Sequence, residues 1–144
     1  MYRKFFVLCF ALIMLSACNR HEEDGADACA LSFCEAFFNF RYADALNMCD
    51  SGQDGWSRIY LSNLREADED SIRLVSVRPS FDIDGVTHYG DSNATATVNV
   101  HNVYYIDSIA KSGHLVKDGK YRLFLTKDKS VWKIRRGDLL RSGK

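Results

Sequence analysis

The sequence ATATVNV at residues 94–100 alternates small or branched apolar residues with polar residues at every step. Strict alternation is typical of a β-strand with one buried face, because successive side chains of a strand point to opposite faces of the sheet. The alternation then slips at His101 and Asn102, since Val103 and Tyr105 stand on the opposite parity. We therefore expect a long strand from residue 94 onward, with a bulge as one way to reconcile its two halves.

Further strands are expected on both sides of this one. Residues 72–77 open a predicted strand that ends near Phe81 or Ile83, with Pro79 marking an edge or a bend. Residues 82–91, which include Gly85 and Gly90, are expected to form a loop or a loose hairpin.

After the central strand, residues 113–119 are expected to be a connection. Residues 121–126 and 131–134 predict two strands, and Lys127-Asp128-Lys129-Ser130 is a plausible hairpin turn between them. Gly137 is expected to end the core, with a loose basic tail at residues 137–144.

The part of the chain before the strands has helical periodicity. From about residue 27, Cys29, Phe33, Phe37 and Phe40 fall on one face of a predicted helix, and Cys34 and Phe38 widen the stripe. Residues 39–41 predict a turn, residues 42–49 a short second helix, and residues 56–67 a third. Helices followed by at least four antiparallel strands predict an α+β fold, with the N-terminal helices packed on a curved sheet.

Three stretches of this pattern resemble those of a known superfamily. They are FFNFRYADAL at residues 37–46, GDSNATATV at residues 90–98 and VWKI at residues 131–134. In this order and spacing they resemble the nuclear-transport-factor-2-like superfamily, and in particular small bacterial lipoproteins of unknown function with such a domain. The resemblance implies a cone-shaped domain over residues 27–136. The superfamily contains enzymes, ligand carriers and interaction modules, so the fold alone does not give the function.

The N-terminus has the pattern of an export signal. Arg3 and Lys4 precede the apolar run of residues 5–15, which is too short for a membrane-spanning helix of about 17–25 residues. The run ends in Leu15-Ser16-Ala17-Cys18, which resembles the bacterial lipoprotein box. That resemblance implies a cleaved signal peptide at residues 1–17 and a lipid on Cys18, and simple secretion is the alternative.

The residues after Cys18 bear on where the protein resides. Residues 18–26 are expected to be the lipidated cysteine and a charged tether. Asn19 stands where Asp favours inner-membrane retention in Gram-negative sorting systems, so the resemblance favours the outer membrane. The acidic residues 22–24 resemble surface-export signals, although a solvated linker is the simpler reading, and the periplasmic or surface side stays open.

Composition excludes some classes of function. The chain has 19 basic and 19 acidic residues, and loss of Arg3 and Lys4 with the signal leaves a slightly acidic mature protein. A slightly acidic exported chain argues against a nucleic-acid partner. The basic end of the chain, residues 127–144, could meet an anionic surface, although a solvated edge is the more common reading of such a run.

Three cysteines remain in the mature chain besides the anchor. If the chain reverses near residue 41, Cys34 and Cys49 lie at the same level of an antiparallel helix pair. A disulfide between them would close a loop of about 15 residues and stabilise the fold by about 3 kcal/mol in the chain-entropy model. The alternative is that Cys29, Cys34 and Cys49 are buried thiols.

No motif with diagnostic catalytic or metal-binding spacing is present in the sequence. We therefore assign no catalytic residue, no metal site and no cofactor. The resemblance to a cone fold implies a possible pocket, and Tyr60, His101 and Tyr105 are candidates to line it. The resulting hypothesis is a non-enzymatic, lipid-anchored envelope protein that binds another protein or an envelope ligand. The alternative is a carrier or an enzyme that uses the cone cavity.

Overall fold

A computed structural model describes residues 25–51, 78–106, 113–138 and 140–142 of the chain. The predicted signal peptide, the helix at residues 56–67 and the strand at residues 72–77 lie outside these ranges. So do Cys18 and Tyr60.

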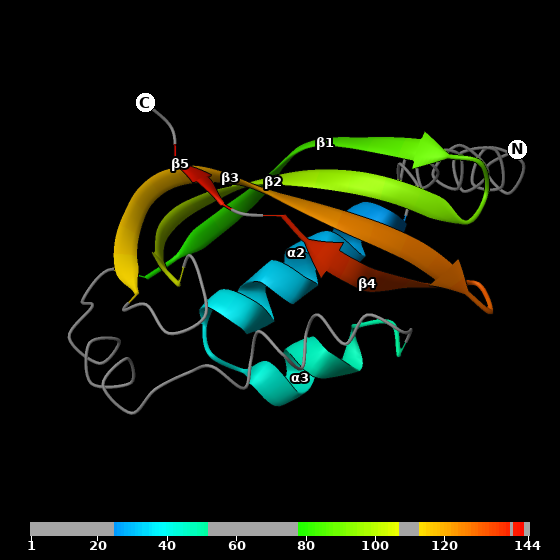
Figure 1. The fold of residues 1–144 in the computed structure, drawn as a ribbon, viewed down its shortest axis with the longest axis horizontal. Coiled ribbons are helices and arrows are strands. Elements are labelled where there is room, and N and C mark those ends of the chain that lie inside the picture. The colour runs from blue at the N-terminus through cyan, green and yellow to red at the C-terminus, as the bar shows by residue number, and fades with distance from the viewer. Residues whose placement is uncertain (1–24, 52–77, 107–112, 139, 143–144) are drawn as a thin grey trace, which may run out of the picture.

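Helix α2 (Gly25–Phe38) lies under the curved sheet (Figure 1). It carries three of the six buried aromatic residues in the described ranges. Phe33, Cys34, Phe37 and Phe38 are buried on it, as its apolar stripe predicts. The predicted turn follows, with Phe40 at a φ of 63°, and the chain reverses into helix α3 (Tyr42–Asn47). The second helix is therefore confirmed, although it ends two residues earlier than predicted.

The strands form one antiparallel sheet. Its path is β1 (Ser80–Tyr89), β2 (Asn93–Tyr105), β3 (His114–Asp128) and β4 (Val131–Gly137), and the short β5 (Arg141–Ser142) pairs with β3. With two helices packed against this sheet, the predicted α+β class with at least four strands is confirmed.

The core lies between α2 and the inner face of the sheet. On β2 the even-numbered residues from Ala94 to Val100 are buried, and their neighbours are at least partly exposed. Leu123 and Leu125 of β3 and Ile134 of β4 continue this buried face. The alternation in residues 94–100 therefore predicted correctly which side chains face α2.

The two strands β2 and β3 bend together at Asn102. The predicted bulge is wrong, because their pairing keeps one register from Asn93↔Thr126 to Tyr105↔His114. Asn102 instead adopts a φ of 54°, and the parity of burial changes there on β2 and between Val116 and Gly119 on β3. The buried face therefore changes on both strands at this point, with no extra residue in either strand.

Two predicted irregular segments are strands. Residues 82–89 belong to β1, and the β1–β2 turn is confined to residues 90–92, where Gly90 has a φ of 69°. Residues 114–119 belong to β3 rather than to a connection. By contrast, the predicted hairpin after residue 126 is confirmed, with Lys129 and Ser130 both at positive φ, as a two-residue type I′ turn requires.

The predicted loose tail is partly attached to the sheet. Arg141 and Ser142 pair with Lys120 and Gly119, and the amide of Leu140 donates to the hydroxyl of Tyr105 at 3.2 Å. A Cβ at Gly119 would lie 3.2 Å from the carbonyl oxygen of Arg141, so a glycine at this position permits the close approach of β5.

Candidate functional site

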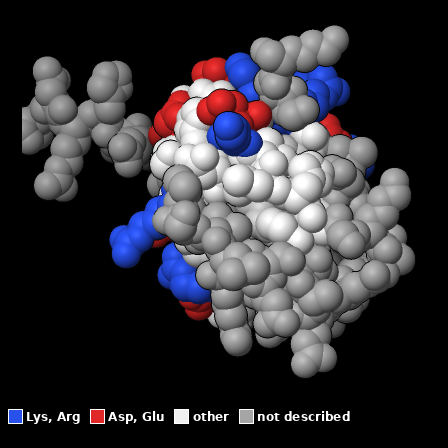
Figure 2. Space-filling model, turned by 90° about the vertical axis from the view of Figure 1, so that its left-hand side faces the viewer, with Lys and Arg blue, Asp and Glu red and all other residues white. Residues whose placement is uncertain are grey.

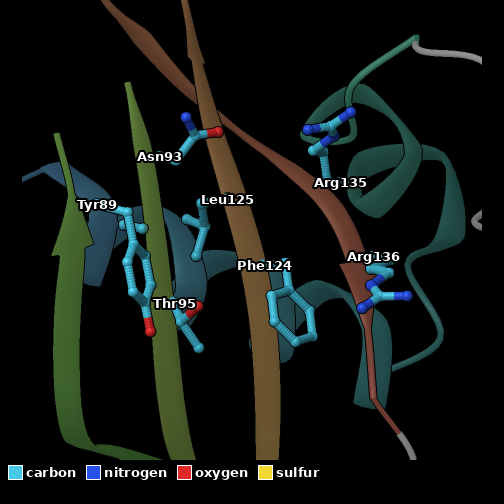
Figure 3. A pocket seen from close by; sticks show the side chains of 8 residues that line it. Tyr89, Asn93, Thr95, Phe124, Leu125, Arg135 and Arg136 are labelled. Carbon is cyan, nitrogen blue, oxygen red and sulfur yellow. The ribbon is translucent and has the colours of Figure 1, made fainter. Parts of the chain in front are cut away.

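A groove of about 470 Å³ lies across the four long strands (Figure 3). Thr95 and Phe124 stand between residues whose side chains are buried toward α2, so they project from the opposite, outer face of the sheet. The groove is therefore on the outer face and not between the sheet and the helix. Its lining residues are Tyr89, Asn93, Ala94, Thr95, Phe124, Leu125, Arg135 and Arg136.

A bulge in β4 turns two adjacent arginines toward this groove. Leu125 pairs with Ile134, whereas Phe124 pairs with Arg136, so Arg135 is the extra residue. Strict alternation after buried Ile134 would direct Arg136 into the core. The extra residue removes that conflict, and both arginines are exposed.

The groove combines positive charge with aromatic surface. The guanidinium carbon of Arg136 lies 4.5 Å from the centroid of the Phe124 ring, a cation–π arrangement that holds the side chain over the outer face. Tyr89 is 61% exposed at the far side. None of the eight described lining residues is acidic. Within the described ranges, neither Arg135 nor Arg136 has a carboxylate within ion-pair distance.

A second polar cluster lies on the same outer face, nearer the bend at Asn102. His101 Nδ1 lies 2.7 Å from Asp118 Oδ1, and its Nε2 lies 3.3 Å from Asp82 Oδ1. Beside this group, Lys120 Nζ lies 2.7 Å from Asp84. Acidic and basic side chains also gather along the sheet side of the molecule, at the top of Figure 2. In contrast to the groove, this cluster has its positive charges matched by carboxylates.

The histidine cluster predicts a small pH dependence of stability. Hydrogen bonds to Asp118 and then to Asp82 raise the pKa of His101 above its ordinary value of 6.5. The stability that protonated His101 adds to the folded state is therefore present below pH 6.5 and is lost as the pH rises through the folded-state pKa. Urea unfolding of the wild type and of His101→Gln should show a larger stability difference at pH 5.5 than at pH 8.5, and an equal difference would contradict this assignment.

The pKa of Asp82, in the same cluster, shifts in the opposite direction to that of His101. The amide of Asn99, which donates to Asp82 at 2.8 Å, and then His101 lower the pKa of Asp82 below 3.8. The stability that ionised Asp82 adds to the folded state is present above pH 3.8 and is lost as the pH falls through the folded-state pKa. Because the cluster is exposed to solvent, both contributions are screened.

The space between α2 and the sheet is filled by aromatic rings. Phe37 stacks on Phe33 at 5.4 Å between centroids and on Tyr121 at 6.2 Å. Phe38 packs edge-on against Tyr121 at 5.5 Å and stacks with Phe81 at 5.8 Å. This side of the sheet therefore serves as packed core in the described part of the domain.

The structure places two of the predicted pocket residues, His101 and Tyr105, on opposite faces of the sheet. His101 lies on the outer face, whereas Tyr105 is 2% exposed on the inner face, where its ring lies 6.3 Å from that of Tyr121. The change of face is a consequence of the left-handed backbone at Asn102. Tyr60 lies outside the described residues, so its place in a pocket stays a prediction.

Cys34 and Cys49 have different surroundings and are not bridged in the structure. Cys34 is fully buried on the core side of α2, and burial raises the pKa of its thiol far above the ordinary value. Cys49 lies past the end of α3, at the edge of β4 beside Ile134. Because α3 is short, Cys49 belongs to the segment that pairs with the sheet rather than to the helix pair.

The described ranges contain neither a candidate metal cluster nor a candidate membrane-spanning helix. Among these residues there is no cluster of three or more His, Cys, Asp or Glu side chains that could hold a metal ion. Neither of the two described helices has the length and apolar character needed to cross a membrane.

Sequence reasoning missed the groove for an identifiable reason. Residues 135 and 136 belong to the basic end of the chain, residues 127–144, for which a solvated edge is the more common reading, and Tyr89 belongs to an expected loop or loose hairpin. The available signal was the dipeptide Arg135-Arg136 directly after the alternating residues of β4, where one arginine would face the core unless a bulge intervened.

The fold and the groove together define an α+β domain with a basic, partly aromatic recess on the outer face of its sheet. No family model and no curated protein matches the chain. Among solved structures, the chain is similar to a ketosteroid isomerase-like protein from Erwinia carotovora atroseptica, with 16% identity and a TM-score of 0.49. The match covers 81% of this chain and 94% of that chain. An identity this low does not carry an activity from one protein to the other.

Proposed function

We propose that this protein is a lipid-anchored cell-envelope protein whose nuclear-transport-factor-2-like domain is a non-enzymatic binding module. In this proposal Cys18 carries the lipid, residues 18–26 are the tether, and the outer membrane is favoured by Asn19. The observation that carries the binding role is the pair Arg135 and Arg136, turned by a bulge into a groove that has no acidic residue among its described lining.

The ligand class follows from the chemistry of the groove. Two guanidinium groups offer planar, paired donors that match the oxygens of a carboxylate or a phosphate. Tyr89 and Phe124 provide flat apolar surface beside them. We therefore propose that the groove binds an oxyanion of an envelope component, with the adjoining part of that component lying on the aromatic rings.

In the described part of the domain, the packed space between α2 and the sheet argues against the carrier or enzyme alternative. A cavity ligand would need the space that Phe33, Phe37 and Tyr121 fill with stacked rings. The described histidine with a shifted pKa, His101, lies on the outer face and is held between two carboxylates. Neither feature is what a general base inside a cone requires.

Binding to two anionic probes tests the proposal. One probe is a vesicle of phosphatidylglycerol, compared with phosphatidylcholine, and the other is a polyglutamate peptide, so the two arms separate phosphate from carboxylate recognition. Every protein in the test carries Cys18→Ala, so that a lipid on Cys18 does not mediate binding to the vesicle. The protein should bind at least one probe at low salt. Arg135→Ala/Arg136→Ala should weaken that binding about tenfold or more, because each charged hydrogen bond lost is worth about 1.5–3 kcal/mol.

The matched control is Arg78→Ala/Lys117→Ala. It removes the same charge from two exposed positions that are not among the described lining residues of the groove. Equal weakening by both double variants would mean that net charge and not the groove is responsible. If neither probe binds, the proposed ligand class is wrong.

A further inference from the structure

Cys29 and Cys49 reach β4 from two different helical segments. Cys29 lies on α2, half-buried, and its thiol donates to the carbonyl oxygen of Trp132 at 3.4 Å. Cys49 follows α3 and forms a parallel bridge with Ile134. Two backbone hydrogen bonds form this bridge. The amide of Ile134 donates to the carbonyl oxygen of Met48 at 2.9 Å, and the amide of Asp50 donates to the carbonyl oxygen of Ile134 at 2.7 Å.

These contacts place the two cysteines on the same edge of one strand. Residues two apart on a strand direct their backbone groups to the same edge, and they lie about 6.6–6.8 Å apart along it. Trp132 and Ile134 are two apart, and each of them contacts one of the cysteine segments. The spacing of Trp132 and Ile134 along β4 is comparable with the Cα–Cα span of about 4.4–6.8 Å that a disulfide bridges.

The electrostatics of Cys29 agree with this proximity. Burial raises the pKa of the Cys29 thiol to about 11, the Lys133 ammonium lowers it, and Cys49 raises it. The same Lys133 donates to the carbonyl oxygen of Asn47 at 2.8 Å, directly before the Cys49 segment. The pKa of the Cys34 thiol, in contrast, is raised by burial alone, because Cys34 is fully buried on the core side of α2.

We propose that Cys29 and Cys49 form a disulfide that fastens the first turns of α2 to the segment after α3, along the edge of β4 that faces away from β3. Formation in the cell rests on the proposed export, because oxidising conditions are found in the envelope. The bond would leave Cys34 as the remaining buried thiol and so accounts for the odd number of cysteines in the mature domain.

The chemistry requires a disulfide oxidant, such as oxidised glutathione. The thiolate of one cysteine attacks the oxidant, which forms a mixed disulfide and releases one glutathione thiolate. The second cysteine loses its proton and attacks the mixed disulfide, which forms the protein disulfide and releases the second glutathione. Two protein thiols are oxidised, and one glutathione disulfide is reduced to two thiols. The high pKa of Cys29 makes the reaction slow at neutral pH and faster as the pH rises.

The test uses the full chain in detergent with Cys9→Ala and Cys18→Ala in every variant, so that only the three cysteines of the domain react. After equilibration in a glutathione redox buffer, free thiols are alkylated and counted by mass spectrometry. The parent and Cys34→Ala should each lose two thiols to one internal disulfide, whereas Cys29→Ala and Cys49→Ala should not form it. Oxidation should raise the thermal midpoint of the parent on the order of 10 °C.

Two results would overturn the proposal. One is that the parent keeps all three thiols. The other is that Cys29→Ala still forms the bond while Cys34→Ala does not, which would establish the Cys34–Cys49 pairing instead. Because the buffer supplies the oxidant, the outcome does not depend on where the protein resides in the cell, so failure of this disulfide and failure of the proposed envelope function are separate results.

Discussion

Replacing Phe37 with alanine is expected to lower the free energy of unfolding by about 3–5 kcal/mol. Phe37 is 6% exposed and packs against the rings of Phe33, Phe38 and Tyr121. Alanine would leave a cavity between α2 and the sheet that neighbouring rings fill only in part. A loss of this size is comparable with the whole stability of many small domains, so the variant should be largely unfolded at elevated temperature.

Urea unfolding followed by circular dichroism measures this effect. The matched control is Leu115→Ala, because Leu115 is 45% exposed on β3 and leaves little cavity when shortened. The control should change the free energy of unfolding by less than about 1 kcal/mol. If Phe37→Ala were no more destabilising than the control, the interior would not be the packed core that the non-enzymatic proposal requires.

Replacing Cys18 with alanine is expected to abolish lipid attachment. In the proposed maturation, the thioether can form only on this sulfur, and the signal peptide is removed before it. Two or three acyl chains make the anchor nearly permanent, since each buried methylene contributes about 0.8 kcal/mol. Incorporation of labelled palmitate in cells that process lipoproteins measures the effect directly.

Cys9→Ala is the control for this experiment, because Cys9 lies within the apolar run of residues 5–15 and should be removed with the signal. It should incorporate palmitate like the wild type. Labelling of Cys18→Ala at the wild-type level would show that another residue is the acceptor, and absence of label in the wild type would contradict the anchor.

The sequence predicted those parts of the fold that depend on local pattern. The alternation in residues 94–100 identified the buried face of β2, and the aromatic stripe from Phe33 to Phe38 identified the face of α2 that meets the sheet. The turn after residue 126 was also predictable, because a short polar segment between two apolar strands favours a hairpin.

The sequence did not predict most of β1, although its partner strand β2 follows directly in the chain. Residues 82–89 contain Asp82, Asp84 and Gly85, which are typical of loops. In the structure the two carboxylates face His101 and Lys120, from β2 and β3, and Gly85 stands next to a bulge. These contacts form only after the sheet assembles, so no local pattern records them.

The candidate site was missed for the same physical reason. Whether Arg136 faces solvent or core depends on the register between β3 and β4, and the extra residue at Arg135 decides it. The face of Tyr105 likewise depends on the backbone of Asn102, which lies between Tyr105 and the alternating residues 94–100. Side-chain direction past an irregularity cannot be read from alternation alone.

The central claim is that the domain binds through the outer groove and not through its interior. Nuclear magnetic resonance of backbone amides during titration with the preferred anionic probe tests it most directly. We expect the shifts to concentrate at residues 93–95, 124–125 and 135–136, which line the groove. Shifts concentrated instead on α2, Tyr105 and Tyr121 would place the ligand in the interior and contradict the claim, as would a titration that moves no resonance of the groove.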